Sequence, residues 1–166
     1  KGGEDSACQR ACGAAWAALT SHSMPRLAAG ESDLFALCMR NCLAVVASAS
    51  GDTTRATFGA VVSGGLDRVS KEAPGWPDAA REAAWDLLGS LSGELAEHVA
   101  TSQAPARPLC LALALAASRI DHPDAAGAMD ALRKPLRSLL GAEGGWREQQ
   151  KALQVLSGQA ARHVAE

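Results

Sequence analysis

Apolar residues recur three and four positions apart along most of this chain, and that spacing constrains the fold more than any other feature. Such a spacing places apolar side chains on one face of an α-helix. Clusters of proline and glycine interrupt the pattern and divide the chain into segments. Helices are therefore expected at residues 5–20, 32–48, 53–72, 77–99, 109–120 and 146–164, with another that opens at Pro123 and is kinked or split at Pro135.

Two of the expected breaks rest on particular residues. The stretch SHSMPRLAAGE, residues 21–31, is expected to be a loop because it contains Pro25 and Gly30. Gly64 and Gly65 are expected to divide 53–72 into two short helices, since each glycine costs roughly 1 kcal/mol relative to alanine inside a helix. With these breaks, the chain is expected to form about seven to nine helices.

The spacing also predicts which side chains the first two helices bury. The stripe expected to be buried in 5–20 consists of Cys8, Cys12, Ala15, Trp16 and Leu19. The second helix is expected to have Ser32 as its N-cap. The side chains that it is expected to bury are Leu34, Leu37, Cys38, Cys42, Val45 and Val46.

Composition supports an all-α fold in a single domain. Alanine is abundant, whereas the 166-residue chain has no tyrosine and only two phenylalanines, and this balance favours helices over sheets. A net charge of -2 with both signs interspersed gives no field that would attract nucleic acid. No stretch is apolar over a length that would span a bilayer, so direct membrane insertion is not expected.

Two ten-residue segments indicate internal repetition. LSGELAEHVA at 91–100 is similar to LSGQAARHVA at 156–165, and each follows a turn containing glycine and tryptophan and closes a longer expected helix. The pattern resembles the armadillo repeat. The residues that carry the resemblance are Gly64, Gly65, Leu66, Pro77, Asp78, Ala83, Ala84, Trp85, Leu88 and Leu91. Residues 33–47, with Arg40 and Asn41, are similar to the end of an earlier repeat.

The resemblance implies an armadillo/HEAT-like right-handed α-solenoid, and an irregular multi-helix bundle is the alternative. The single domain, residues 1–166, would consist of a helical hairpin at 1–50 and armadillo-like units at 51–103 and 104–166. Stacked helical repeats expose a long surface on their long helices. The resemblance therefore implies other protein chains as partners, with Arg40, Asn41 and Trp85 as partner-binding residues. Roles in packing for Trp85 and in capping for Asn41 are the alternative.

The same cysteine spacing occurs twice, as CQRAC at 8–12 and CMRNC at 38–42. An antiparallel hairpin around Pro25 would bring Cys8 opposite Cys42 and Cys12 opposite Cys38, which would allow two disulfides. Reduced thiols in the core and a zinc ion held by four thiolates are the other states left open. The twin C-x3-C layout resembles that of the small chaperones of the mitochondrial intermembrane space, although the segment between the two pairs is longer here.

No motif for catalysis is evident. The chain has no G-x-S-x-G, no phosphate-binding loop and no H-E-x-x-H, and His22, His98, His122 and His163 are scattered. We therefore expect a protein without catalytic residues, metal or cofactor, which acts as an interaction module or accessory subunit of a larger assembly. The alternative is an organellar hairpin protein with disulfides or a metal in the twin C-x3-C. The sequence does not specify a compartment, and paired cysteines would favour the intermembrane space.

Overall fold

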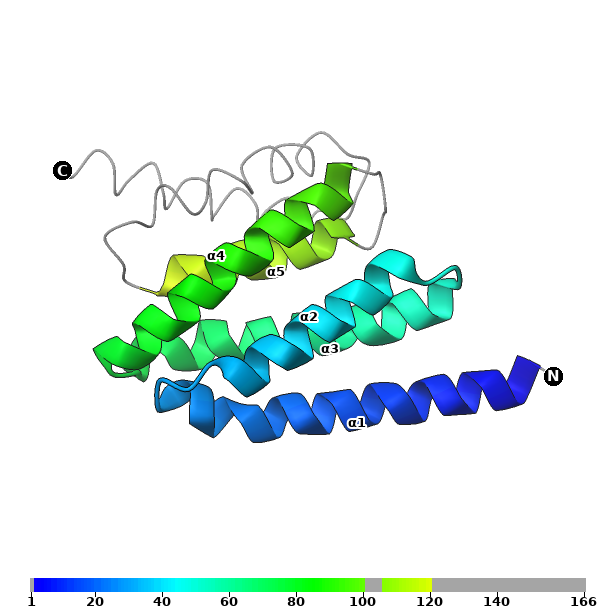
Figure 1. Cartoon of the computed structure of the whole chain (residues 1–166), viewed down its shortest axis with the longest axis horizontal. Coiled ribbons are helices and arrows are strands. Elements are labelled where there is room, and N and C mark those ends of the chain that lie inside the picture. Colours follow the sequence, from blue (N-terminus) through cyan, green and yellow to red (C-terminus); the bar gives the residue numbers. More distant parts are fainter. Residues whose placement is uncertain (1, 101–105, 121–166) are drawn as a thin grey trace.

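The computed structural model describes residues 2–100 and 106–120, and over these ranges the chain forms helices joined by short loops, without strands (Figure 1). The elements are α1 (Gly2–Ala28), α2 (Asp33–Ser48), α3 (Asp52–Glu72), a short 3-10 helix η1 (Ala73–Gly75), α4 (Asp78–Ala100) and α5 (Ala106–Arg119). The all-α prediction is thus confirmed. The expected helices after residue 120, and with them the second copy of the LSG repeat, lie outside the described residues.

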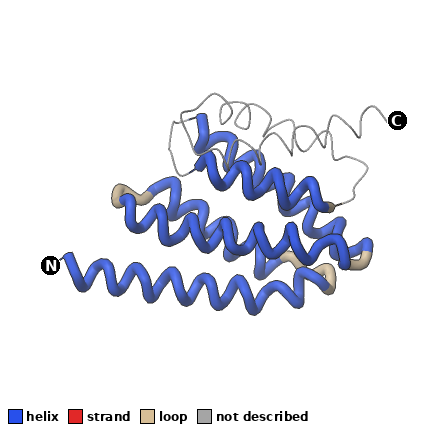
Figure 2. The backbone as a smooth tube through the Cα atoms, turned by 180° about the vertical axis from the view of Figure 1, so that it is seen from behind, coloured by secondary structure: helices blue, strands red, loops and turns tan. Residues whose placement is uncertain are grey.

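Helix α3 occupies the centre of the arrangement. It packs against α1, α2 and α5, while α4 packs mainly against α5. Seen from both sides, α1 forms one edge, the α2–α3 hairpin lies next to it, and α4 with α5 forms the following layer (Figures 1 and 2). Consequently α1 has neighbours on one side only among the described helices.

Helix α1 is longer than expected, because the predicted loop at 21–31 begins only after Ala28. Pro25 lies within its last turn, where the proline ring removes a single backbone donor. The neighbouring Met24 and Leu27 are fully buried, and this burial offsets the cost of the proline. The expected loop at 21–28 is therefore wrong.

Gly30 ends α1 in the way that glycine commonly ends helices. Its φ of 92° lies in the left-handed region, its N–H donates to the Leu27 carbonyl at 2.9 Å, and the Glu31 N–H donates to the Arg26 carbonyl at 2.8 Å. This pair of hydrogen bonds is a Schellman motif. An ion pair between Arg26 and Glu31 at 3.0 Å closes the same turn.

Gly64 and Gly65 do not break α3, so that prediction is also wrong. Gly65 faces the interior, where an added Cβ would lie 2.9 Å from Met39 Cε and 3.1 Å from Thr20 Cγ2. Its missing side chain lets α1, α2 and α3 approach one another closely. The packing gained by this approach offsets the low helix propensity of the two glycines.

The core confirms part of the expected burial in α2. Cys38, Cys42 and Val46 are buried as predicted, together with Phe35, Met39 and Leu43. Leu37 was expected in the core but is 53% exposed. Ser32 occupies the expected N-cap position, although its side chain makes no capping hydrogen bond.

Candidate protein-binding surface

The face of α1 that packs against the rest of the molecule is made of small and polar residues as much as apolar ones. Its buried residues are Gly13, Thr20, Ser23, Met24 and Leu27. At Gly13 an added Cβ would lie only 2.3 Å from Thr57 Cγ2 of α3. The glycine therefore sets how closely α1 and α3 approach.

Two hydroxyl groups on this packed face are satisfied within α1 itself. Thr20 donates to the carbonyl of Trp16 at 2.8 Å, and Ser23 donates to the carbonyl of Thr20 at 2.6 Å. Because these hydroxyls already have acceptors, their burial does not carry the cost of an unpaired polar group. A polar stripe can therefore face the core.

A second face of α1, beside the packed one, is left outside. Its exposed residues at alternating spacings of four and three are Cys8, Cys12, Ala15, Leu19 and His22, and we call this set the outer face of α1. The predicted buried stripe of α1 is thus wrong for four of its members, which lie on this face. Only Trp16 leans against the core, as a half-buried residue.

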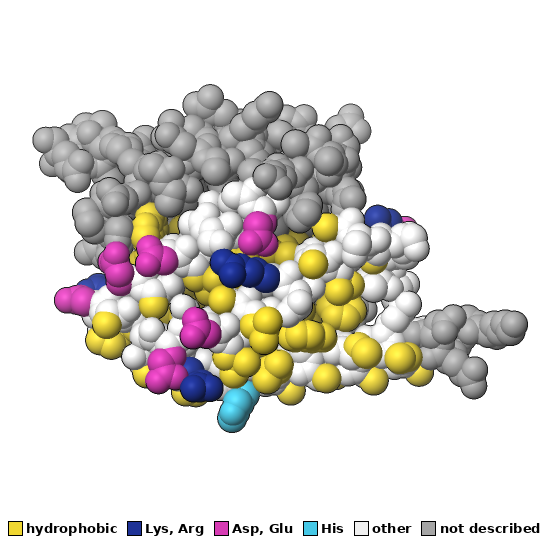
Figure 3. All heavy atoms as spheres, in the orientation of Figure 1, with side chains coloured by type: hydrophobic (Ala, Val, Ile, Leu, Met, Phe, Trp, Pro, Cys, Tyr) yellow, Lys and Arg dark blue, Asp and Glu magenta, His cyan; other side chains and the backbone are white. Residues whose placement is uncertain are grey.

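No charged residue occurs in α1 between Arg10 and Arg26. Figure 3 shows hydrophobic side chains following α1 along its outer edge, with a histidine projecting from the same edge. Leu19 on this face is 36% exposed and is one of the two large hydrophobic side chains, with Leu37, that the described part of the chain exposes. The outer face of α1 is therefore exposed and mainly apolar, and it carries no Asp, Glu, Lys or Arg.

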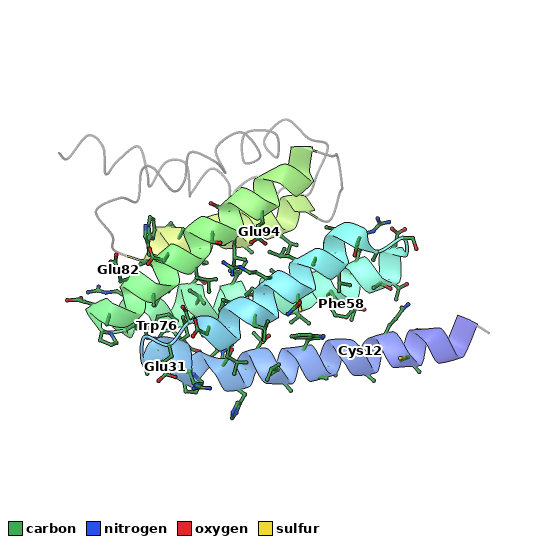
Figure 4. All side chains as sticks on the ribbon, viewed as in Figure 1. Cys12, Glu31, Phe58, Trp76, Glu82 and Glu94 are labelled. Atoms are coloured by element: carbon green, nitrogen blue, oxygen red, sulfur yellow. The ribbon has the colours of Figure 1, made fainter. Side chains whose placement is uncertain are left out.

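The two cysteine pairs lie in opposite environments. Cys8 and Cys12 are exposed on α1, whereas Cys38 and Cys42 are buried in α2, and all four are free thiols. Figure 4 shows Cys12 on α1, the helix at the edge of the molecule. The hairpin of α1 and α2 thus does not bring Cys8 to Cys42 or Cys12 to Cys38. Among the residues that the structure describes, no group of three or more metal-ligating side chains comes together.

Burial makes the inner thiols weak acids. It raises the pKa of Cys42 to about 11, and the neighbouring Cys38 adds a smaller increase. Burial also raises the pKa of Cys38, against which a hydrogen bond with Thr20 acts. Since the thiolate is the reactive and metal-binding form, these two residues behave as core side chains near neutral pH.

The residues predicted to bind partners are only partly together. Arg40 and Asn41 are exposed neighbours on α2, whereas Trp85 of α4 lies in the core and is 6% exposed. The Arg40 guanidinium donates to Ser90 Oγ at 2.8 Å and pairs with Glu94 at 3.5 Å. Both partners belong to α4, and Figure 4 shows Glu94 on the side of α4 toward α2. Trp85 is thus placed as a packing residue rather than as part of a surface.

Asn41 uses its side chain within its own helix. Its Nδ2 donates to the Leu37 carbonyl at 2.9 Å, and the group is exposed. In an armadillo-type surface, the asparagine amide would have to turn from this bond toward a partner. The role of Asn41 and Arg40 in binding remains a prediction.

The apolar spacing of the outer face of α1 predicts burial, so the sequence did not indicate this face as a surface. One signal could have identified it. Helix α1 contains a second stripe without charge, Gly13, Thr20, Met24 and Leu27, with helical spacing. A helix with two uncharged stripes can bury either of them, and the one with the closer fit faces the core.

Comparison of the chain with protein families, with curated proteins and with solved structures gives no match in any of the three. No described helix has both the length and the apolar character needed to cross a membrane.

Proposed function

We propose that this chain is a non-catalytic protein–protein interaction module, or an accessory subunit of a larger assembly, and that the outer face of α1 is its principal contact surface. One observation carries the proposal. The most regular apolar stripe of α1 faces outward and carries no charge between Arg10 and Arg26.

The physical argument concerns the composition of exposed helix faces. A helix at the edge of a protein normally turns charged side chains to water and apolar ones inward. On α1, alanine, cysteine and leucine face outward instead. Charged residues are depleted at the centres of protein interfaces, and exposed apolar patches mark interaction sites. The outer face of α1 has both properties.

A helical-repeat architecture is part of the proposal. The hairpin of α1 and α2 (1–50) would precede an armadillo-like unit that contains α3 and α4 (51–103) and a further unit that begins with α5 (104–166). Packing of α3 on α5, together with the bridge from Arg40 to Ser90 and Glu94, supports this stacking. Arg40 and Asn41 would then form a second contact point for another protein chain on the exposed side of α2.

The alternative built on the twin C-x3-C motif gains no support from the placement of the cysteines. It requires Cys8 and Cys12 to lie opposite Cys42 and Cys38, but one pair is exposed and the other is buried. A rearrangement of α1 about its own axis would be needed to bring them together. That rotation would also withdraw Met24 and Leu27 from the core.

Site-specific photo-cross-linking in extract of the native source tests the proposal. A benzophenone amino acid at Leu19 would lie on the outer face of α1, and the same amino acid at the exposed Ala60 of α3 is the matched control. We expect a discrete protein adduct from position 19 and none from position 60. Equal or absent cross-linking at the two positions would contradict the proposed surface.

A further inference from the structure

We propose that the outer face of α1 binds the same face of a second copy of this chain, with the two α1 helices packed antiparallel. This inference rests on the proposed function and specifies its partner. The observations that carry it are the spacing of the outer residues, the absence of Asp, Glu, Lys and Arg among them, and the complementarity of this face to itself in an antiparallel pair.

The spacing of the outer face is that of a coiled-coil seam. Cys8, Cys12, Ala15, Leu19 and His22 follow one another at intervals of four, three, four and three residues. These intervals assign Cys8, Ala15 and His22 to d positions and Cys12 and Leu19 to a positions of a heptad. All five residues are exposed in the single chain, so the seam is complete and has no partner among the described helices.

An antiparallel register makes the seam complementary to itself. When a positions face d positions, Leu19 of one copy lies against Ala15 of the other, and Cys12 lies against His22. Each large side chain then meets a small one. Every contact occurs twice, once from each copy, as a two-fold axis requires. The alanines at neighbouring exposed positions, Ala11 and Ala18, allow the two backbones to approach closely.

The direction of the helix dipoles favours the antiparallel orientation. Arg26 belongs to the last turn of α1, and in the proposed register it lies opposite Cys8 of the second copy. The positive end of each helix dipole then lies beside the negative end of the other, which stabilises an antiparallel pair. Arg26 can keep its bond to Glu31, because its guanidinium has five N–H donors.

The size of the seam sets the expected strength of the dimer. From Cys8 to His22 it spans roughly 22 Å at about 1.5 Å per residue. One helix pair of this length buries less than the roughly 1,200–2,000 Å² of a standard stable interface. We therefore expect a reversible dimer with a dissociation constant on the order of 10 µM rather than a permanent one.

Sedimentation velocity over a concentration series tests the association. Leu19→Glu introduces a charge into the seam, and Leu37→Glu is the matched control, since both leucines are exposed in the single chain. We expect the wild type and L37E to dimerise alike and L19E to dissociate at least tenfold more readily, with unchanged helical circular dichroism. A wild-type chain that stays monomeric to about 1 mM, or a dimer that L19E leaves intact, would overturn the inference.

Cysteine cross-linking tests the orientation. His22→Cys places a thiol opposite Cys12 of the second copy only if the helices are antiparallel. We expect mild oxidation to give a covalent dimer with H22C and not with H22C/C12S, whereas the wild type stays uncross-linked through Cys12. A wild-type dimer joined from Cys12 to Cys12 would instead show a parallel pair and overturn this register.

Photo-cross-linking at Leu19 separates failure of the inference from failure of the proposed function. An adduct with a different protein, from a chain that is itself monomeric, would overturn the second copy as the occupant and leave the interaction module standing. A monomeric chain without any adduct from position 19 would overturn both. An adduct between two copies supports both.

Discussion

The two C-x3-C segments have the same spacing, but one is exposed and the other is buried. In α2, Cys38 and Cys42 are fully buried, while in α1, Cys8 and Cys12 are exposed. The spacing guarantees only that both sulfurs lie on one helix face. The rest of each helix decides whether that face is packed.

The neighbours of each pair explain the difference. In α2 the cysteines share their face with three larger apolar side chains, Phe35, Met39 and Val46, and all of them are buried. In α1 a second stripe competes, and it includes Gly13, where the backbone can approach Thr57 of α3. Close packing around a glycine, with Met24 and Leu27 at the other end, outweighs the burial of two thiols and a few alanines.

Introducing a carboxylate is expected to distinguish the buried cysteine pair from the exposed pair by the largest difference in stability. Cys42→Asp would bury a charge without a partner and is expected to lower the free energy of unfolding by about 4 kcal/mol. Cys12→Asp adds a charge to an exposed face and is expected to change that free energy by less than about 0.5 kcal/mol. Urea unfolding followed by circular dichroism measures both. Equal losses in the two variants would show that Cys12 is buried as well.

A substitution at Gly13 tests why α1 packs with the face that it does. Gly13→Leu places side-chain atoms where Thr57 Cγ2 already lies, and we expect a loss of about 2 kcal/mol from overpacking. The matched control is Gly64→Leu, because nothing lies within 4 Å of an added Cβ at that exposed glycine. The control is expected to be neutral or slightly stabilising. If thermal unfolding showed no loss in G13L, the close contact of α1 with α3 would not fix the face.

Alkaline pH is expected to distinguish the two cysteine pairs by a smaller change in stability. The pKa of the Cys42 thiol rises from 9.0 to about 11 on folding, so between these values the unfolded chain has released a proton that the folded chain retains. Stability contributed by Cys42 is therefore complete below pH 9 and is lost as the pH rises toward 11, by at most about 1.4 kcal/mol per pH unit. Unfolding curves at pH 8, 9 and 10 should show this slope in the wild type and a shallower one in Cys42→Ala. A Cys12→Ala variant with the same reduction in slope would contradict the difference between the pairs.

The helices were largely predictable from sequence, and their ends and faces were less so. The spacing of Leu88 and Leu91 and the position of Pro77 identify α4, although the helix contains two glycines, Gly89 and Gly93. Pro25 and Gly65 were misjudged, since their local cost is evident from the sequence while the packing that offsets it depends on residues distant in the chain. Met39 and Thr20 around Gly65 are an example.

The candidate surface was predictable only in part. Arg40 and Asn41 were expected to be exposed on α2 and are, whereas Trp85 lies in the core. A lone tryptophan among alanines and leucines does not reveal which side of α4 meets α5. For α1 the apolar stripe was identified correctly, but its direction depends on how Gly13 and Thr20 fit against α3, which spacing alone does not specify.

Thiol-labelling kinetics of the native protein test the central claim most directly. Short pulses of an alkylating reagent, followed by peptide mass spectrometry, report the labelling of each cysteine separately. Labelling of Cys110 is therefore not mistaken for labelling of the other four cysteines. At about 1 µM, where we expect the chain to be monomeric, we predict labelling of Cys8 and Cys12 at rates close to those in urea. We predict protection of Cys38 and Cys42 by at least about a thousandfold, as full burial in a stable core implies. Equal protection of all four cysteines, or rapid labelling of Cys38 and Cys42, would contradict the claim that α1 turns its cysteine face outward while α2 turns its own inward.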